Sequence, residues 1–255
     1  SLDPNFYMAH NDIGVVLGRR NDFAHAEAHF FNSIRVAPGY AVAYYNLGVI
    51  YERQGRYEDA IRRYAESAAI DPAAPDPQLN LALMTLLKGD LADGLKRYEW
   101  RWKLPRVAPL IKPFAQPQWR GEPIAGKKLL IHAEQGMGDT LQVARYCKTA
   151  AALGARVVLM VQPSLVSLLK QVEGAAAVVP DSATPEVAFD VHIPMLSLPQ
   201  VLGTTLETIP ADVPYLKADP TLTAAWRNRL SADKNFRVGI AWAGSPTHKN
   251  DRNRS

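Results

Sequence analysis

The chain has 255 residues, of which 47% are hydrophobic and 21% are charged, and its formal net charge is +4. These fractions match ordinary globular proteins and exclude a disordered or fibrous chain. No uncharged apolar run approaches the ~18 residues of a membrane span, so the composition predicts no transmembrane segment. The single cysteine, Cys147, excludes a disulfide framework and a cysteine-based zinc site within the chain, and favours a reducing compartment. We therefore expect a cytoplasmic location.

The charge is concentrated in the middle of the chain. Residues 88–128 contain ten Lys or Arg and four Asp or Glu, so the remainder is slightly acidic. A basic segment favours an anionic ligand, an acidic partner or nucleic acid. A solvated helix face followed by a linker is the alternative interpretation.

The N-terminal part of the chain repeats with a period of 34. Helix-ending prolines, small residues and aromatic residues all recur at that spacing: Pro4, Pro38 and Pro72; Gly14 and Gly48; Ala26 and Ala60; Phe30 and Tyr64. In residues 41–72, Tyr44, Leu47, Gly48 and Tyr51 lie on one helical face, and Gly55 marks a turn. The pattern predicts stacked helix pairs, since one pair has too little core to stand alone.

This stretch resembles the tetratricopeptide repeat family. We expect repeats over residues 1–103: the tail of one repeat, two full repeats, and a divergent capping unit from Pro75 to about Lys103. In the capping unit Gly94 replaces an alanine, and Arg101 stands at a small-residue position.

Such arrays bind proteins or peptides on a concave face. Asn11, Asn46 and Asn80 fall near the inner helix of each unit, where their amides would hydrogen-bond a peptide backbone. The alternative is that they cap or solvate helices. His25 and His29 lie four residues apart, but the zinc-protease pattern needs a glutamate next to the first histidine, so we predict no metal site.

Residues 104–126 are rich in proline and predict an extended linker, after which the periodicity changes. Residues 127–255 predict a Rossmann-like domain of alternating strands and helices with a parallel sheet. Strands are expected at 127–133, 156–161, 177–179, 189–193 and 236–243, and helices at 140–153, 164–172 and 221–230.

Ligands of such sheets bind at the carboxyl ends of strands, near helix N-termini, where the loop from Gln135 to Asp139 falls. Gly136 and Gly138 allow the backbone to approach a ligand closely. The dinucleotide fingerprint would need a third glycine at Leu141, so NAD is not predicted. On spacing alone, a tight turn with Asp139 as helix N-cap is favoured over a ligand loop.

The segment after the last expected strand carries donors that suit phosphate oxygens. These are Ser245, Thr247, Lys249, Arg252 and Arg254. A disordered basic tail is the alternative.

Residues 119–146 and 238–255 together resemble the first half of a two-Rossmann (GT-B) glycosyltransferase related to the heptosyltransferases and, more distantly, to protein O-linked N-acetylglucosamine transferases. The resemblance implies that Asp139 is the general base on an acceptor hydroxyl. It implies that Ser245, Thr247 and Lys249, with Arg252 and Arg254 adding charge, hold the donor diphosphate, although the spacing in this tail departs from the heptosyltransferase pattern. His132 and Glu134 also differ from the residues of that family. They are either acceptor contacts of a subfamily or polar groups at the end of a strand.

The sequence thus predicts an α plus α/β protein: repeat hairpins followed by the first half of a GT-B fold. The expected function is inverting, metal-independent sugar transfer from a nucleotide sugar to an acceptor on a protein or glycan, with no cofactor. Because most of a second Rossmann unit is missing, the 255-residue chain alone is expected to be inactive or nearly so. The alternative is a protein-interaction scaffold with a degenerate transferase-like domain. Nucleic acid is not expected, since no RNA- or DNA-reading motif is present.

Overall fold

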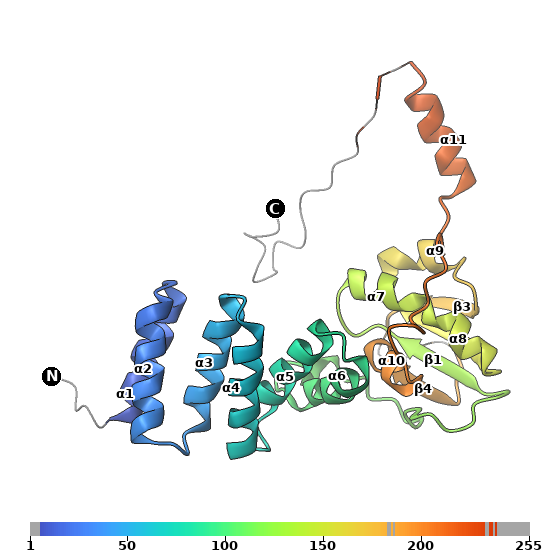
Figure 1. Ribbon diagram of the computed structural model, residues 1–255. Coiled ribbons are helices and arrows are strands. Elements are labelled where there is room, and N and C mark those ends of the chain that lie inside the picture. The colour runs from blue at the N-terminus through green and yellow to red at the C-terminus, as the bar shows by residue number, and fades with distance from the viewer. Residues whose placement is uncertain (1–5, 183–184, 186, 233–234, 237, 239–255) are drawn as a thin grey trace. The chain divides into compact units, whose positions relative to one another are not determined.

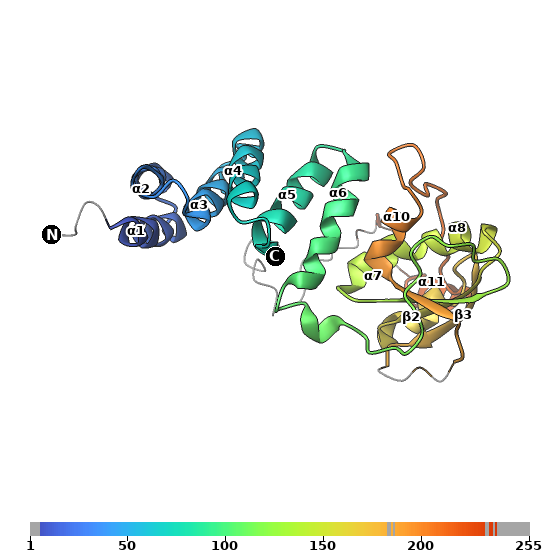
Figure 2. The same ribbon diagram turned by 90° about the horizontal axis from the view of Figure 1, so that it is seen from below.

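The computed structural model describes residues 6–182, 185, 187–232, 235–236 and 238. The chain divides into two compact units, residues 1–216 and 217–255. The first unit holds the helical repeats and the parallel sheet (Figures 1 and 2). The second contains helix α11 (Pro220–Arg229), which has no buried residue in the part of the chain that the structure describes.

Six helices form three antiparallel pairs, as the period of the sequence predicts. They are α1 (Tyr7–Arg19), α2 (Phe23–Val36), α3 (Ala41–Arg53), α4 (Tyr57–Ile70), α5 (Pro75–Leu87) and α6 (Leu91–Tyr98). Within each pair the turn needs a residue with positive φ, supplied in register by Asn21, Gly55 and Gly89. Asparagine tolerates this conformation better than other non-glycine residues, which explains its place in the first pair.

Small residues allow the paired helices to pack closely. A Cβ on Gly48 would come within 2.6 Å of the fully buried Tyr64 ring, and one on Gly14 within 2.7 Å of Phe30. Ser33 and Ser67, which occupy equivalent positions in successive repeats, each donate a 2.8 Å hydrogen bond to a backbone carbonyl at the start of the preceding helix. The repeat pattern therefore encodes both close contact and one buried polar link per unit.

Within the described residues the sheet has four parallel strands in the order β3-β2-β1-β4, confirming the expected parallel sheet. The strands are β1 (Lys128–His132), β2 (Arg156–Val161), β3 (Ala175–Pro180) and β4 (Val191–Pro194). The expected strand at 236–243 lies almost entirely outside the described residues. Because β4 lies on the opposite side of β1 from β2, the order of the strands reverses at β1.

One face of the sheet is covered by helices, and the other by Phe114, which precedes β1, and Phe189, which precedes β4. Leu129 and Ile131 pack against Val143 and Cys147, from α7 (Met137–Ala144) and α8 (Tyr146–Ala152). Leu130 points to the other face, which Phe114 and Phe189 cover. Trp119 and Ile124, from the expected linker, are buried in the helix-covered core. That segment therefore contributes to the packing of the sheet.

Two expected helices have different bounds in the structure. The helix expected at 140–153 begins at Met137 and is split at Arg145 into α7 and α8. The helix expected at 164–172 is shorter: a 3-10 turn, η3 (Pro163–Leu165), runs into α9 (Val166–Leu169). The remaining elements are the 3-10 turns η1 (Glu99–Lys103), η2 (Ala108–Leu110) and η4 (Met195–Ser197), and the helix α10 (Leu198–Val201).

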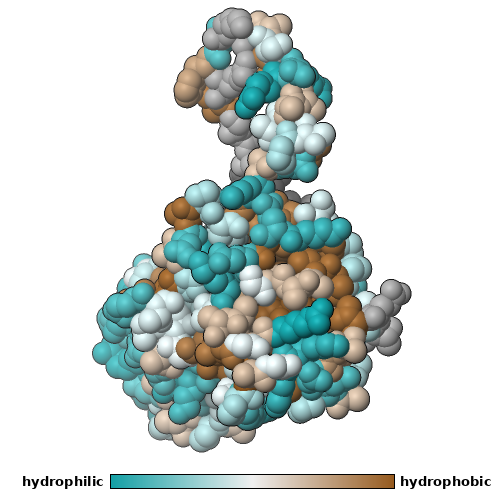
Figure 3. Space-filling view, turned by 90° about the vertical axis from the view of Figure 1, so that its right-hand side faces the viewer, coloured by the Kyte–Doolittle hydropathy of each residue, from teal (hydrophilic) through white to brown (hydrophobic). Residues whose placement is uncertain are grey.

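The surface of the molecule seen in Figure 3 mixes apolar and polar residues in small patches. Of the described helices, none has the length and apolarity that a membrane crossing requires.

Candidate functional site

The carboxyl ends of β1 and β4 lie side by side at the point where the strand order reverses. His132 and Pro194 end the two strands and are register partners. Glu134 follows β1, and Ser197 follows β4. In open parallel sheets a ligand crevice lies outside the strand ends at such a reversal, so this edge is the first place to look for a site.

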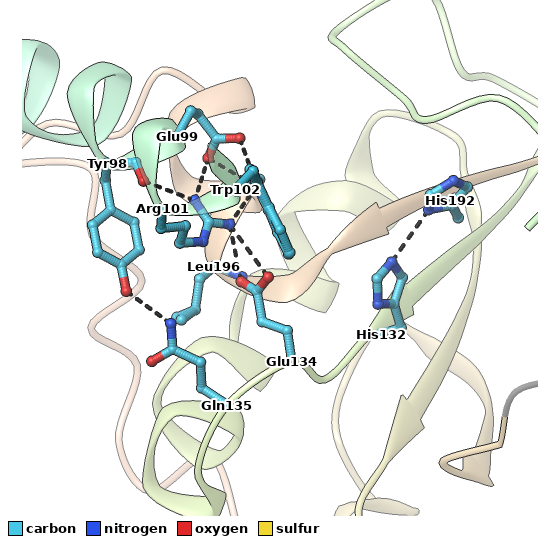
Figure 4. Close-up of polar contacts among 10 residues, drawn as sticks. Tyr98, Glu99, Arg101, Trp102, His132, Glu134, Gln135, His192 and Leu196 are labelled. Carbon is cyan, nitrogen blue, oxygen red and sulfur yellow. Dashed lines mark hydrogen bonds and ion pairs between the residues drawn. The ribbon is translucent and has the colours of Figure 1, made fainter. Parts of the chain in front are cut away.

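The side chain that occupies this edge comes from the repeat array. Arg101, in η1, is 1% exposed. Its Nη2 donates to Glu134 Oε1 at 3.0 Å, and its Nη1 donates to Glu99 Oε1 at 2.6 Å (Figure 4). The same Nη2 donates to Ser197 Oγ at 2.7 Å. Ser197 Oγ in turn donates to Glu99 at 2.8 Å. One guanidinium therefore joins the last repeat to the loops after both strands.

Arg101 occupies the position that Ser33 and Ser67 occupy in the two earlier repeats. Sequence reasoning marked this residue as a departure from the repeat but named no partner for it. The feature that could have revealed the partner is the position of Arg101 in the repeat. This position is fully buried in the other repeats, and an arginine there requires a buried acid.

Glu134 is that acid. It is 8% exposed, and its Oε1 also accepts the Leu196 N–H at 3.1 Å. Burial raises the pKa of Glu134 to about 7, against the opposing influence of Arg101. The sequence left Glu134 open as an acceptor contact or a strand-end polar group. In the structure its carboxylate accepts hydrogen bonds from Arg101 and from the Leu196 N–H. It therefore has a bracing role, in that it fixes the last repeat to the loops that follow β1 and β4.

Asp139 lies in the first turn of α7. The favoured expectation, that Asp139 is the N-cap, is wrong: Gly136 is the N-cap, and its N–H donates to Asp139 Oδ2 at 3.0 Å. Asp139 therefore caps the helix from inside its first turn. Among described residues Oδ1 has no hydrogen-bond partner. A Cβ on Gly138 would meet nothing within 4 Å, so the space beside this turn is open.

Asp139 lines a cavity of about 350 Å³, which we call the Asp139 cavity. The walls come from both parts of the unit: Leu83, Leu86, Leu91, Leu95 and Tyr98 from the last repeat, and Gln142, Val143, Arg145, Tyr146, Leu196, Pro199, Thr204 and Ile209 from the sheet domain. Arg145 donates to the Pro210 carbonyl at 2.9 Å. The arrangement presents one carboxylate and one guanidinium in a largely apolar enclosure.

The three asparagines make hydrogen bonds inside the array. Asn46 donates to Asn11 Oδ1 at 2.8 Å, which links the first two helix pairs, and Asn80 donates to the Tyr64 hydroxyl at 3.1 Å. Asn11 is buried, whereas Asn46 and Asn80 are half-buried. These bonds orient the side chains, and peptide binding by them stays a prediction.

For the remaining expected site residues, no side-chain positions are described. Ser245, Thr247, Lys249, Arg252 and Arg254 lie outside the described residues. Within the described part of the chain, no group of three or more His, Cys, Asp or Glu is placed to hold a metal ion. His25 pairs with Asp22 at 2.8 Å, and His29 faces His10 at 3.0 Å.

A histidine pair that sequence reasoning did not connect joins β1 and β4, near Arg101 and Glu134 (Figure 4). His132 Nε2 and His192 Nδ1 are 3.2 Å apart (Figure 4). Phe114 packs edge-on against both rings. Burial lowers the pKa of His132 to about 3, and burial also lowers that of His192. Both imidazoles are therefore neutral at physiological pH.

Residues 11–77 match the family model described as tetratricopeptide repeat, so this part of the chain carries these repeats. Among curated proteins none matches the chain. Solved structures that match include the crystal structure of MamA, 24% identical over 40% of this chain and 60% of that chain, with a TM-score of 0.38. Another is the second TPR of Spaghetti (RPAP3) bound to the HSP90 peptide SRMEEVD, 15% identical over 38% and 91% of the two chains, with a TM-score of 0.37. The chain thus spans about 60% of the length of the MamA chain.

Proposed function

We propose that this protein uses its repeat array to hold a protein or peptide and transfers a sugar from a nucleotide-sugar donor to a hydroxyl of its acceptor at the Asp139 cavity. Tetratricopeptide repeats over residues 11–77 suggest a protein-interaction scaffold. The transfer reaction is the finer part of the proposal. It rests on the residues around Asp139 and on the sequence resemblance of the sheet domain to GT-B transferases.

One observation carries the catalytic role. Asp139 has one carboxylate oxygen anchored by the Gly136 N–H and the other without a partner among described residues, in a cavity whose wall the last repeat supplies. A general base needs a fixed orientation and a free lone pair within reach of the proton that it removes. This geometry provides both.

The proposed reaction needs no metal. As the acceptor oxygen attacks the anomeric carbon, its proton passes to Asp139. The bond between the anomeric carbon and the diphosphate breaks, and its electron pair leaves with the diphosphate. Gly136 and Gly138 are the described residues proposed to lie near the donor, and the space beside Gly138 is open. Ser245, Thr247, Lys249, Arg252 and Arg254 remain proposed diphosphate contacts.

The array offers a route for the acceptor. Val15, Val49 and Leu83 recur at the period of the repeat and so occupy the same place on the first helix of each pair. Leu83 is 41% exposed and also lines the Asp139 cavity. A peptide lying along this row, with its backbone near Asn46 and Asn80, would reach the cavity.

A second candidate function is the scaffold alone, without catalysis. It is favoured by Arg101, whose guanidinium occupies the edge between β1 and β4 where a substrate of such a sheet would bind. The cytoplasmic location expected from the single cysteine stays a prediction.

The test is sugar transfer by the full-length protein and its Asp139→Asn variant, with labelled nucleotide sugars. Asparagine keeps an oxygen for the Gly136 N–H, so the fold is retained while the base is lost. We expect transfer to fall by about 10²–10⁴-fold. Unchanged transfer would show that Asp139 is not the base. Absence of turnover and of UDP, GDP or ADP binding by calorimetry would favour the scaffold.

A further inference from the structure

The Asp139 cavity is lined mostly by apolar side chains, and the transfer step proposed above uses none of them. The last helix pair contributes four leucines, Leu83, Leu86, Leu91 and Leu95. Leu83 is 41% exposed and the other three are half-buried, so the sheet domain that forms the opposite wall does not cover them completely. Apolar surface left in contact with water favours a ligand that covers it with apolar groups of its own.

Two of these leucines stand at positions that hold glutamates in earlier repeats. Leu86 corresponds to Glu52 of the second repeat, and Leu95 corresponds to Glu27 of the first. Both glutamates accept a hydrogen bond from a tyrosine hydroxyl within the array. The last repeat therefore has leucines in place of acids at two positions that line the cavity, which makes this end of the array more apolar than the rest.

Two of the polar side chains in the cavity wall already have partners. Arg145 donates to the Pro210 carbonyl at 2.9 Å, and the Tyr98 hydroxyl accepts from the Gln135 amide at 2.9 Å. Sugar rings and water molecules need hydrogen-bond partners on several sides, and leucine walls do not supply them. An apolar group needs no such partners, and the free oxygen of Asp139 can accept a hydrogen bond from a hydroxyl beside it.

The repeat array indicates what kind of molecule brings this apolar group. Val15, Val49 and Leu83 occupy equivalent places on the first helix of successive pairs, and Leu83 also lines the cavity. Val15 and Val49 lie within the residues that match the tetratricopeptide repeat model. Repeats of this kind present extended surfaces for binding, so a polypeptide held along this apolar row would continue to the leucines of the cavity.

We propose that the leucine-lined part of the Asp139 cavity binds an apolar side chain of the acceptor peptide, beside the serine or threonine whose hydroxyl lies at Asp139. This inference rests on the proposed function and adds the class of acceptor: a peptide with leucine, methionine or phenylalanine next to the residue that receives the sugar. The cavity volume of about 350 Å³ lies near the lower end of the ~300–1,000 Å³ range of ligand pockets, which suits a side chain and its neighbouring hydroxyl.

The first experiment measures binding without any sugar donor. Methyl signals of Leu86 and Leu95 in the ¹³C-labelled full-length protein are followed by NMR while each probe is added to about 50 mM. The apolar probes are N-acetyl-leucinamide and N-acetyl-phenylalaninamide. N-acetyl-asparaginamide is the polar comparison of similar size, and uridine and octanoate represent a nucleotide and a lipid. We expect both apolar amides to shift the two signals in a saturable way, and asparaginamide to shift neither.

Two exposed leucines of α5, one turn apart, provide a matched pair of variants. Leu83 is 41% exposed and lines the cavity, whereas Leu87 is 59% exposed and does not line it. Leu83→Gln should weaken binding of the apolar amides by about 5–10-fold, and Leu87→Gln should leave it unchanged. Circular dichroism establishes that each variant is folded. The proposal is overturned if neither apolar amide shifts the signals, if asparaginamide, uridine or octanoate shifts them more than the apolar amides do, or if the two folded variants bind the amides equally.

A second measurement separates this inference from the proposed function. Two serine peptides that differ only in having leucine or aspartate next to the serine are offered as acceptors, with a labelled nucleotide sugar. We expect transfer to the leucine peptide to be faster by about 10-fold or more, and this preference to be smaller in Leu83→Gln. Equal transfer to both peptides would refute the inference alone. Amide binding without any sugar transfer would refute the proposed function while the apolar pocket stands.

Discussion

Replacing Arg101 by serine gives the capping unit the residue that the two earlier repeats have at this position. In those repeats serine bonds a nearby carbonyl. At position 101 it would instead leave the buried Glu134 carboxylate without its cation. Removing one partner of a buried ion pair costs about 3–5 kcal/mol. Part of this cost comes from the charge left on Glu134, and the rest from Ser197 and Glu99, which lose their hydrogen bonds to the guanidinium, and from the lost packing of the arginine side chain. We expect Arg101→Ser to reduce the free energy of unfolding by that amount at pH 8.

The pH dependence of this loss has a definite sign. Burial raises the pKa of Glu134 to about 7 from 4.5. Loss of Arg101 removes an influence that lowers this pKa, so Glu134 in the variant would titrate at a higher pH than in the wild type. A further rise of one unit is worth about 1.4 kcal/mol when pH passes both values. The destabilisation should therefore be smaller at pH 5.5 than at pH 8 by about 1 kcal/mol.

Urea unfolding followed by circular dichroism at both pH values measures the effect. Arg97→Ser, which removes a surface ion pair with Asp93, is the matched control and should cost at most about 0.5 kcal/mol. In Arg101→Ser/Glu134→Gln the carboxylate is absent, so part of the loss should be recovered and the two sites should couple by about 1–3 kcal/mol. An Arg101→Ser variant that is no less stable at pH 8 than the Arg97→Ser control would refute the bracing role.

Three further predictions concern packing and titration. Gly48→Ala would push a methyl group into the Tyr64 ring and should cost about 1–3 kcal/mol in urea unfolding, whereas Gly39→Ala, which meets open space, should be near neutral; equal costs would contradict the close-packing argument. Because burial lowers the folded-state pKa of His132 to about 3 from 6.5, stability present above pH 6.5 should be lost on acidification toward pH 3. The wild type should lose about 1.4 kcal/mol per pH unit relative to His132→Gln, and parallel pH profiles would argue against a buried neutral imidazole. Burial also raises the pKa of Cys147 to about 12, so iodoacetamide should label it only as fast as the protein unfolds, and rapid labelling of the folded protein would contradict its burial.

Local and periodic features of the fold were predictable. The period of the repeat places six helices, because each repeat carries its own small residues, turn and helix-ending proline. The parallel sheet follows from alternating strand and helix patterns. The start of α7 was missed because the Gly-Met-Gly composition around Gly136 is typical of a loop, while the cap that extends the helix comes from Asp139, inside it.

The candidate site was only partly predictable, because its decisive contacts join distant residues. Arg101 meets Glu134 33 positions later and Ser197 96 positions later, and His132 meets His192 60 positions later. No periodicity connects such pairs. A buried arginine in place of a serine signals that a partner exists, but only the folded sheet identifies it.

The central claim is that the Asp139 carboxylate removes a proton from an acceptor presented at its cavity. Its most direct test is the rate at which labelled sugar moves from a nucleotide sugar to acceptor hydroxyls in wild-type protein and in Asp139→Asn, both shown to be folded. The account predicts a loss of about 10²–10⁴-fold in the variant. Equal rates in the two proteins would contradict it.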